Sequence, residues 1–512
     1  MSTDTINWTA LAVFIFFFAL VTVLGFVASR WRAGDLTQLH EWGLGGRRFG
    51  TVITWFLVGG DFYTAYTVIA VPALVYSVGA YGFFALPYTI VVYPFVFLVM
   101  PRLWAVCHRH DYVTGADFVH GRYGSSWLAL AVALTGLLAT MPYIALQLVG
   151  MQVVIGALGL GGEGLQGDIP LIIAFVILAV YTYSSGLRAP AMIAFVKDIM
   201  IYIVVIAAVA IIPLRLGGYG AVFDAADKAF QAKGGVTGLI LQPGQFVPFA
   251  TLALGSAFAA FMYPHTMTGV LSSSSGNVVR KNAMLLPAYT VLLGLIAMLG
   301  YMAIAAGVQV KTNNAVVPAL FLKIFPDWFV GFSFAAIAIG ALVPAAIMSI
   351  GAANLFTRNI WRVFVNPNIT PAAEASTAKL VSLVVKFGAL VFIVALPTQY
   401  AIDLQLLGGV WILQTFPAIV LGLYKARLRP TALLIGWAVG MVVGTTLAYQ
   451  MGLKPVYPLA IGGVTYPVYI GILAGSVNLV VSLVLSPVLG MMGVGTGTDA
   501  TRPEDFQLSG AD

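Results

Sequence analysis

The sequence predicts an all-α integral membrane protein with about 13 transmembrane helices, forming one domain over residues 1–512. Hydrophobic residues make up 60% of the chain and charged residues 8%, whereas soluble domains contain roughly 45–50% and 25%. Apolar runs of about 20 residues, the length that crosses a bilayer, recur along the chain. Lysine and arginine gather in alternate loops between these runs. Together these observations indicate a polytopic helical protein.

The apolar runs predict the spans individually. They cover 8–28, 51–77, 81–103, 127–157, 169–184, 191–214, 246–271, 284–307, 328–356, 379–397, 402–423, 431–450 and 467–489. The first basic residue, Arg30, follows the first run, which therefore lacks the positive start of a cleaved signal peptide and is expected to remain as a span. Cys107 is the one cysteine, so an internal disulfide is excluded.

The placement of positive charge predicts the topology. With the N-terminus outside, the inner loops and the C-terminal tail hold 17 of the 25 lysines and arginines, counting Arg102 and Lys379 at the inner ends of their runs. The outer loops hold Arg215, Lys228, Lys233, Lys311, Lys323 and Lys454, and Lys197 and Lys386 fall within spans. This is the positive-inside pattern, so the net charge of +7 reflects topology and not a nucleic-acid partner. We expect a multi-pass membrane protein with the N-terminus outside and a cytoplasmic C-terminus.

The polar segments leave no room for a soluble catalytic domain, so an enzyme is not expected. We expect Asn313–Phe325 to form a short helix in an outer loop. The tail at 490–512 is rich in Gly, Thr and Asp, and we expect it to be disordered. A channel would show charged rings or a repeated filter motif, and neither is evident. Lys386, two turns into its span, is expected to extend towards the cytoplasm.

The second run is interrupted by Gly59 and Gly60, with Asp61 directly after them. A charge at bilayer depth costs roughly 2.5–3.5 kcal/mol on insertion scales, so it rarely occurs without a role. Adjacent glycines weaken a helix by roughly 1 kcal/mol each. A broken helix with an acid at the break is typical of an ion or substrate site in a transporter. Alternatively, Asp61 caps the second half-helix.

The seventh run carries a similar interruption at Pro264, beside His265. The two breaks lie five spans apart, and an odd offset gives two halves of opposite orientation. This predicts an inverted repeat of residues 51–215 and 246–423 with a site between them. Residues 1–50 then add one span with its inner loop before the repeat, and 431–489 add two peripheral spans after it.

Five segments resemble motifs of the sodium:solute symporter family, over nearly the whole chain. They are Leu44–Arg48 (LGGRR), Thr114–Gly124 (TGADFVHGRYG), Gly186–Asp198 (GLRAPAMIAFVKD), Tyr263–His265 (YPH) and Ala345–Ser349 (AAIMS). Two further segments, Gly59–Tyr76 and Ala139–Gly150, look similar to bacterial monocarboxylate permeases, which carry lactate, pyruvate and alanine. The resemblance implies a LeuT-type five-plus-five inverted repeat and secondary active symport by alternating access, with sodium as the coupling ion. It also implies a location in the plasma membrane, the inner membrane of a bacterium.

The resemblance also implies a cation site. Its members are the carbonyls of Gly59, Phe62 and Ala346, the hydroxyl of Ser349, and the carboxylates of Asp61 and Asp198. Two departures from the family pattern concern this site: Ile350 replaces a second Ser or Thr, and Lys197 replaces a Thr before Asp198. The lysine could stand in for the ion and make coupling protonic, or it could pair with a carboxylate. Sodium is the first expectation and a proton the alternative.

A small carboxylate substrate needs positive potential, which the N-terminal ends of the two half-helices supply. The candidate substrate residues are polar members of the broken and neighbouring spans: Tyr63, Thr64, Tyr66, Tyr143, Gln147, Tyr263, His265, Trp411 and Gln414. Any one of them is more often a helix–helix packing contact than a ligand, and for His265 a structural hydrogen bond that supports the break is an equal alternative. An amino acid or another small solute is the alternative substrate. No cofactor besides the coupling ion and no obligate protein partner is expected.

Overall fold

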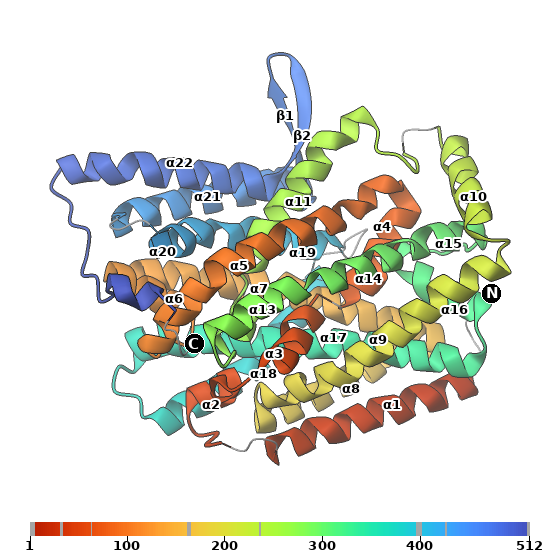
Figure 1. The fold of residues 1–512 in the computed structure, drawn as a ribbon, viewed down its shortest axis with the longest axis horizontal. Coiled ribbons are helices and arrows are strands. Elements are labelled where there is room, and N and C mark those ends of the chain that lie inside the picture. The colour runs from red at the N-terminus through yellow and green to blue at the C-terminus, as the bar shows by residue number, and fades with distance from the viewer. Residues whose placement is uncertain are drawn as a thin grey trace.

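The computed structural model describes residues 6–30, 34–62, 64–160, 165–234, 237–395, 402–424 and 428–508. Long helices run side by side through one bundle, and a single hairpin projects from it (Figure 1). Each of the thirteen predicted runs coincides with one or more helices. The sequence therefore places the helical segments correctly.

The first half follows α1 (Trp8–Val27) and the short α2 (Leu39–Leu44). It contains α3 (Thr51–Thr54), η3 (Trp55–Gly59), η4 (Tyr66–Ala70), α4 (Val71–Val78), η5 (Ala80–Phe84), α5 (Ala85–Arg109), α6 (Gly115–Tyr123), α7 (Ser126–Ile155), η6 (Gly156–Leu160), α8 (Leu165–Ser185) and α9 (Arg188–Arg215). Helix α10 (Tyr219–Ala232) connects it to the second half.

The second half begins with α11 (Phe246–Ala260) and α12 (Pro264–Leu271). It continues with α13 (Gly276–Leu285), α14 (Pro287–Ala297), α15 (Leu299–Ala305), α16 (Val316–Ile324), α17 (Asp327–Leu355), η9 (Phe356–Val365), α18 (Pro371–Ala395), α19 (Ile402–Ile412), η10 (Leu413–Thr415), η11 (Pro417–Leu421) and α20 (Gly422–Tyr424). Helices α21 (Pro430–Gln450) and α22 (Ile470–Met491) follow. The predicted short helix at 313–325 is confirmed by α16 and the 3₁₀ turn before it.

Nine segments of the described chain are helical, long and apolar enough to cross a membrane, and α11 with α12, bent by 50°, makes a tenth. The other predicted spans are the interrupted run at 51–77, α8 and α18, so thirteen stays a prediction. Helix α17 is the central one, because 94% of its apolar window is buried, against 22% for α22. It packs against α1, α7, α9 and α12.

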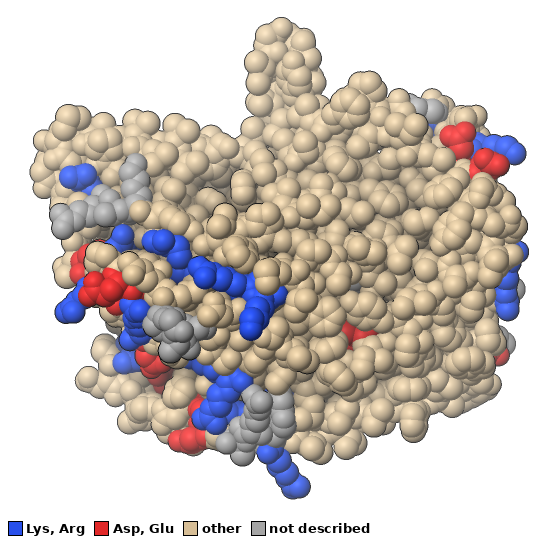
Figure 2. Space-filling view, viewed as in Figure 1, with Lys and Arg blue, Asp and Glu red and all other residues tan. Residues whose placement is uncertain are grey.

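Charged side chains lie mainly at one end of the bundle. Figure 2 shows lysines and arginines gathered on the visible face near α2 and α6, while the helical surface between the two ends is mostly uncharged and a smaller charged group lies at the opposite end, near α10. Many of these cations form salt bridges: Nη2 of Arg47 lies 3.0 Å from Oδ1 of Asp111, and Nη1 of Arg358 lies 3.2 Å from Oε1 of Glu374. The arrangement agrees with the positive-inside pattern and marks this end as the predicted inner face.

The predicted start of the last span, at residue 467, is wrong. Residues Val456–Ile461 (β1) and Val464–Tyr469 (β2) form an antiparallel hairpin, and α22 begins only at Ile470. The turn consists of Gly462 and Gly463, both with positive φ (59° and 82°). A Gly-Gly pair allows the tight turn that such a hairpin requires.

The predicted disorder of the tail is also wrong for its described part, which docks on the inner face. Asp499 lies 2.6 Å from Arg122, and Asp505 lies 2.8 Å from Nε2 of His110. The Phe506 ring belongs to η12 (Pro503–Phe506), and Cζ of Arg122 lies over it, 5.0 Å from the ring centroid. Burial raises the pKa of Asp505, but hydrogen bonds from His110 and from the Arg502 amide outweigh it, and the pKa is lowered.

Candidate functional site at two helix breaks

At the first break two glycines lie against polar side chains from α9 and α14. A Cβ on Gly59 would stand 2.1 Å from a ring carbon of Tyr289, and a Cβ on Gly60 would stand 2.6 Å from Oδ2 of Asp198. No side chain fits at either position. The backbone at the break therefore lies in direct contact with ionisable and hydroxyl groups.

The amides after the first break are bonded to other side chains. Thr67 Oγ1 accepts from the Thr64 amide at 3.1 Å, and Gln147 Oε1 accepts from the Ala65 amide at 3.2 Å. The Thr64 hydroxyl oxygen accepts from the amide two residues later at 2.9 Å. These three amides do not depend on Asp61 as a cap. Gln147, a predicted substrate residue, thereby connects α7 to the broken helix.

The second break separates α11 from α12. Pro264 occupies the first position of α12, where its missing amide costs no hydrogen bond. The Thr266 hydroxyl bridges the break by donating to the Ala260 carbonyl at 2.7 Å. The Tyr263 hydroxyl donates to the Gln405 carbonyl at 3.1 Å, which attaches the break to α19.

The two breaks meet at Asp61 and His265. Nε2 of His265 lies 3.3 Å from Oδ2 of Asp61, and their side chains are 1% and 5% exposed. The ring of Tyr143, on α7, lies 5.3 Å from the rings of both His265 and Tyr263. Two residues that the sequence assigned to different roles thus form one buried pair between the two halves.

Three buried polar atoms at this junction have no hydrogen-bond partner among the described residues. They are Oδ1 of Asp61, Nδ1 of His265 and the hydroxyl of Tyr66. Leaving a buried polar group unsatisfied costs about 1–3 kcal/mol, so such atoms normally meet a water, an ion or a ligand. Their gathering at both breaks favours a polar ligand here.

Beside the first break, Lys197 and Asp198 form a fully buried ion pair, with 2.9 Å between Nζ and Oδ1. The Lys197 ammonium also donates to the Gly60 carbonyl. The Tyr289 hydroxyl donates to the other carboxylate oxygen of Asp198 at 2.8 Å. The interpretation that Lys197 pairs with a carboxylate is confirmed.

The oxygens expected to hold sodium already accept hydrogen bonds from the protein. The Gly59 carbonyl accepts from the Phe62 amide at 3.0 Å. The Ala346 carbonyl, on α17, accepts from the Ser349 hydroxyl at 2.8 Å. Asp198 is engaged by Lys197. Each of the two carbonyls keeps a second lone pair, so the sodium site stays a prediction.

Two other predicted residues bond to the peripheral helices. Trp411 donates its indole N–H to Thr445 of α21 at 3.1 Å, and Gln414 accepts from Asn478 of α22 at 3.1 Å. Their polar groups therefore serve the peripheral helices. The Phe62 ring lies 6.4 Å from that of Phe261. Tyr63 lies outside the described residues.

Sequence reasoning missed Tyr289, which has no signal in its unbroken apolar run. It also misjudged Lys386, which is 1% exposed and donates to the Ser382 carbonyl of its own helix at 3.3 Å. The expected extension of this side chain towards the cytoplasm is wrong. Its position on the face of α18 that carries the buried Ala378, Ser382 and Val385 explains the burial.

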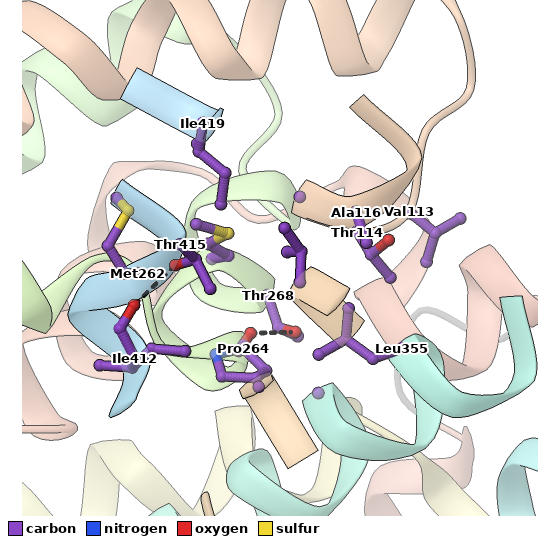
Figure 3. Close-up of a pocket in the computed structure, with 15 residues that line it drawn as sticks. Val113, Thr114, Ala116, Met262, Pro264, Thr268, Leu355, Ile412, Thr415 and Ile419 are labelled. Carbon is purple, nitrogen blue, oxygen red and sulfur yellow. Dashed lines mark hydrogen bonds between the residues drawn. The ribbon is translucent and has the colours of Figure 1, made fainter. Parts of the chain in front are cut away.

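A pocket extends from the second break towards the predicted inner face (Figure 3). Met262, Pro264 and Thr268 line it on one side, and the start of α6, with Thr114, lines it on another. It is partly open and largely apolar, and about 350 Å³ of space within it, open solvent included, is free of atoms. Thr114 donates to Oδ1 of Asn359 at 2.7 Å, so the pocket borders the polar network of the inner loops.

Comparisons with known proteins agree with this architecture. The model of the sodium:solute symporter family matches residues 42–444. The monocarboxylate transport permease protein of Rhizobium johnstonii is 65% identical over 490 residues, covering 96% of this chain and 98% of the relative. The uncharacterized symporter YodF of Bacillus subtilis is 35% identical, covering 85% and 87%.

Among solved structures, a Na+-coupled sialic acid symporter matches with a TM-score of 0.74 at 15% identity, covering 94% of this chain and 97% of that one. Mhp1, a transporter of the nucleobase-cation-symport-1 family, matches with a TM-score of 0.50 at 14% identity, covering 89% and 96%. At these identities the likeness concerns the fold alone. It confirms the expected LeuT-type helical symporter fold.

Proposed function

The chain belongs to the sodium:solute symporter family, and from this premise we propose that it imports small monocarboxylates such as lactate and pyruvate. Uptake is driven by a cation gradient and proceeds by alternating access. The observation that carries the proposal is the junction of the two breaks, where Asp61 and His265 pair beside unpartnered polar atoms. The printed name of the 65% identical relative supports the substrate class.

The junction explains why an anionic substrate needs a cation. Asp61 already contributes a buried carboxylate, and a second carboxylate about 4 Å away would repel it by about 4 kcal/mol at an effective dielectric constant near 20. One positive charge at the Asp61–His265 pair removes this penalty. Substrate and cation therefore bind better together than alone, which is the thermodynamic condition for symport.

The hydroxyl of Tyr66 supplies a donor for the substrate carboxylate, and Tyr143 closes the site from α7 with its ring against His265. The pocket below Pro264 then provides the route towards the inner face. We place the end that carries α2 and α6 in the cytoplasm of a bacterial cell, because the basic residues gather there.

The coupling ion has two candidates. Family membership favours sodium. A proton is the second candidate, because Lys197 donates to the Gly60 carbonyl and pairs with Asp198, where a sodium ion would need those oxygens. Protonation of the Asp61–His265 pair would supply the same single positive charge. An amino acid remains the alternative substrate.

The test is uptake of radiolabelled lactate into proteoliposomes, with sodium and pH gradients imposed separately. We expect accumulation above equilibrium under one of the two gradients, and competition by pyruvate and alanine. If neither gradient drives accumulation, coupling is refuted. If an amino acid other than alanine competes better than lactate or pyruvate, the substrate class is wrong. Liposomes without protein control for leakage of the undissociated acid.

A further inference from the structure

The ion pair beside the first break has the form of an occupied cation site. The Lys197 ammonium lies 2.9 Å from a carboxylate oxygen of Asp198 and donates to the carbonyl of Gly60. A carboxylate and a carbonyl freed by a helix break are the hard oxygen donors that bind a small cation. Here the cation is a side chain of the protein itself.

The space around this ammonium is already filled. A Cβ on Gly60 would stand 3.0 Å from Nζ of Lys197 and 2.6 Å from Oδ2 of Asp198, so the ion pair lies directly against the backbone. Tyr289 occupies the second carboxylate oxygen through its hydroxyl. A sodium ion at the Gly60 carbonyl would have to displace the ammonium or lie beside it as a like charge.

The charges nearby lead to the same conclusion. Lys197 and Asp198 are both fully buried and balance each other, so a sodium ion added to them would carry an uncompensated charge. Asp61 is engaged by His265 across the breaks. The other described lysine buried inside the bundle, Lys386, lies on α18 and bonds to its own helix.

We propose that the ammonium of Lys197 is a resident cation that takes the place of sodium at Gly60 and Asp198, and that this residue determines the ion selectivity of the transporter. The inference rests on the proposed symport function. It follows that sodium does not bind at this site in the wild-type protein. Replacing Lys197 by threonine would leave the carbonyl and carboxylate without a cation, add a hydroxyl oxygen, and create a sodium site.

The experiment measures the melting temperature of the purified full-length protein in detergent, in sodium chloride and in choline chloride at equal ionic strength. The variants are Lys197→Thr, the neutral pair Lys197→Gln with Asp198→Asn, and Lys386→Thr as a matched control for loss of a buried lysine. A ligand that binds only the folded state raises the melting temperature. Binding of ²²Na⁺ to the same samples gives a second readout.

Because a resident ammonium leaves the proton as the coupling ion, we expect no specific sodium effect on the wild type, on Lys386→Thr or on the neutral pair. Lys197→Thr should be stabilised by sodium by about 3 °C or more, an effect of the size that saturating ligand produces. The proposal is overturned if sodium stabilises the wild type, or if folded Lys197→Thr shows neither stabilisation nor ²²Na⁺ binding.

If Lys197→Thr does not fold, binding of ²²Na⁺ to the wild type and to the neutral pair tests the proposal. A folded neutral pair and a wild type that both bind no ²²Na⁺ support the resident cation, whereas ²²Na⁺ bound by the wild type refutes it. Lactate uptake in proteoliposomes is read separately. Absence of uptake under every gradient refutes the proposed function, while the melting and binding data still report on Lys197.

Discussion

Replacing Asp61 by asparagine removes the carboxylate that joins the two helix breaks while keeping the shape of the side chain. In the wild type, Oδ2 of Asp61 lies 3.3 Å from Nε2 of His265. At this separation two unit charges attract by about 5 kcal/mol at an effective dielectric constant near 20. The amide of asparagine retains a hydrogen bond, so we take about 3 kcal/mol as the loss when the cation-loaded state forms.

Because each 1.4 kcal/mol is a factor of ten, a loss of about 3 kcal/mol lowers gradient-driven uptake by about 100-fold. The assay compares the initial rate of lactate accumulation in proteoliposomes of wild type and Asp61→Asn at equal protein content. Exchange of internal for external lactate, which needs no net coupling, should fall far less. Accumulation within threefold of the wild-type rate would refute the role assigned to Asp61.

The remaining predictions concern the supports of the site. Gly59→Ala places a Cβ 2.1 Å from the Tyr289 ring and should destabilise the fold by about 1–3 kcal/mol, measured by thermal unfolding. The control is Gly50→Ala, where no atom lies within 4 Å of the new Cβ and the stability should not change. Equal melting temperatures of the two variants would contradict this prediction. Gln147→Leu leaves an amide at the first break unpaired and should cost about 1–3 kcal/mol, again read from melting. Arg122→Ala removes an ion pair to the tail and should speed its cleavage in limited proteolysis; an unchanged rate would show that the tail is held otherwise. The pKa of Asp505 is lowered in the folded protein, so its ionised carboxylate stabilises the docked tail fully at pH values above the ordinary pKa of 3.8. This stabilisation is lost as the pH falls through the folded-state pKa. The rates of tail cleavage in wild type and Asp505→Asn should therefore differ at pH 6 and converge at strongly acidic pH.

The helices could be predicted because their signals are local. An apolar run of bilayer length and the charge of its flanking loops are visible in any window of the sequence. The two helix breaks could be predicted for the same reason, because Gly59, Gly60 and Pro264 interrupt such runs. The hairpin at Gly462 was overlooked although its Gly-Gly turn is a local signal. The last three residues of β2, Pro467–Tyr469, are apolar and were interpreted as the start of the last span.

The contacts within the site could not be predicted because they depend on how distant helices face one another. Asp61 and His265 were both predicted site residues, but their pairing follows from the meeting of the two halves. Trp411 and Gln414 are polar members of an apolar run, and only the packing of α21 and α22 shows that they bond to these helices. Tyr289 had no distinguishing feature in its run.

The docking of the tail could not be predicted either, because it depends on charged residues in distant segments. Its composition is that of a disordered segment, yet Asp499 and Asp505 complement Arg122 and His110, which lie nearly 400 residues earlier in the chain. Such complementarity between separate segments is absent from any local window. Lys197 is the intermediate case: its departure from the family pattern was visible, but its contact with Gly60 required the fold.

The most direct test of the central claim is lactate accumulation by the wild-type protein in proteoliposomes, with an inward gradient of sodium or of protons imposed one at a time. The account predicts accumulation above equilibrium under at least one gradient, with pyruvate as an effective competitor. Equilibration without accumulation under both gradients would contradict cation-coupled monocarboxylate symport.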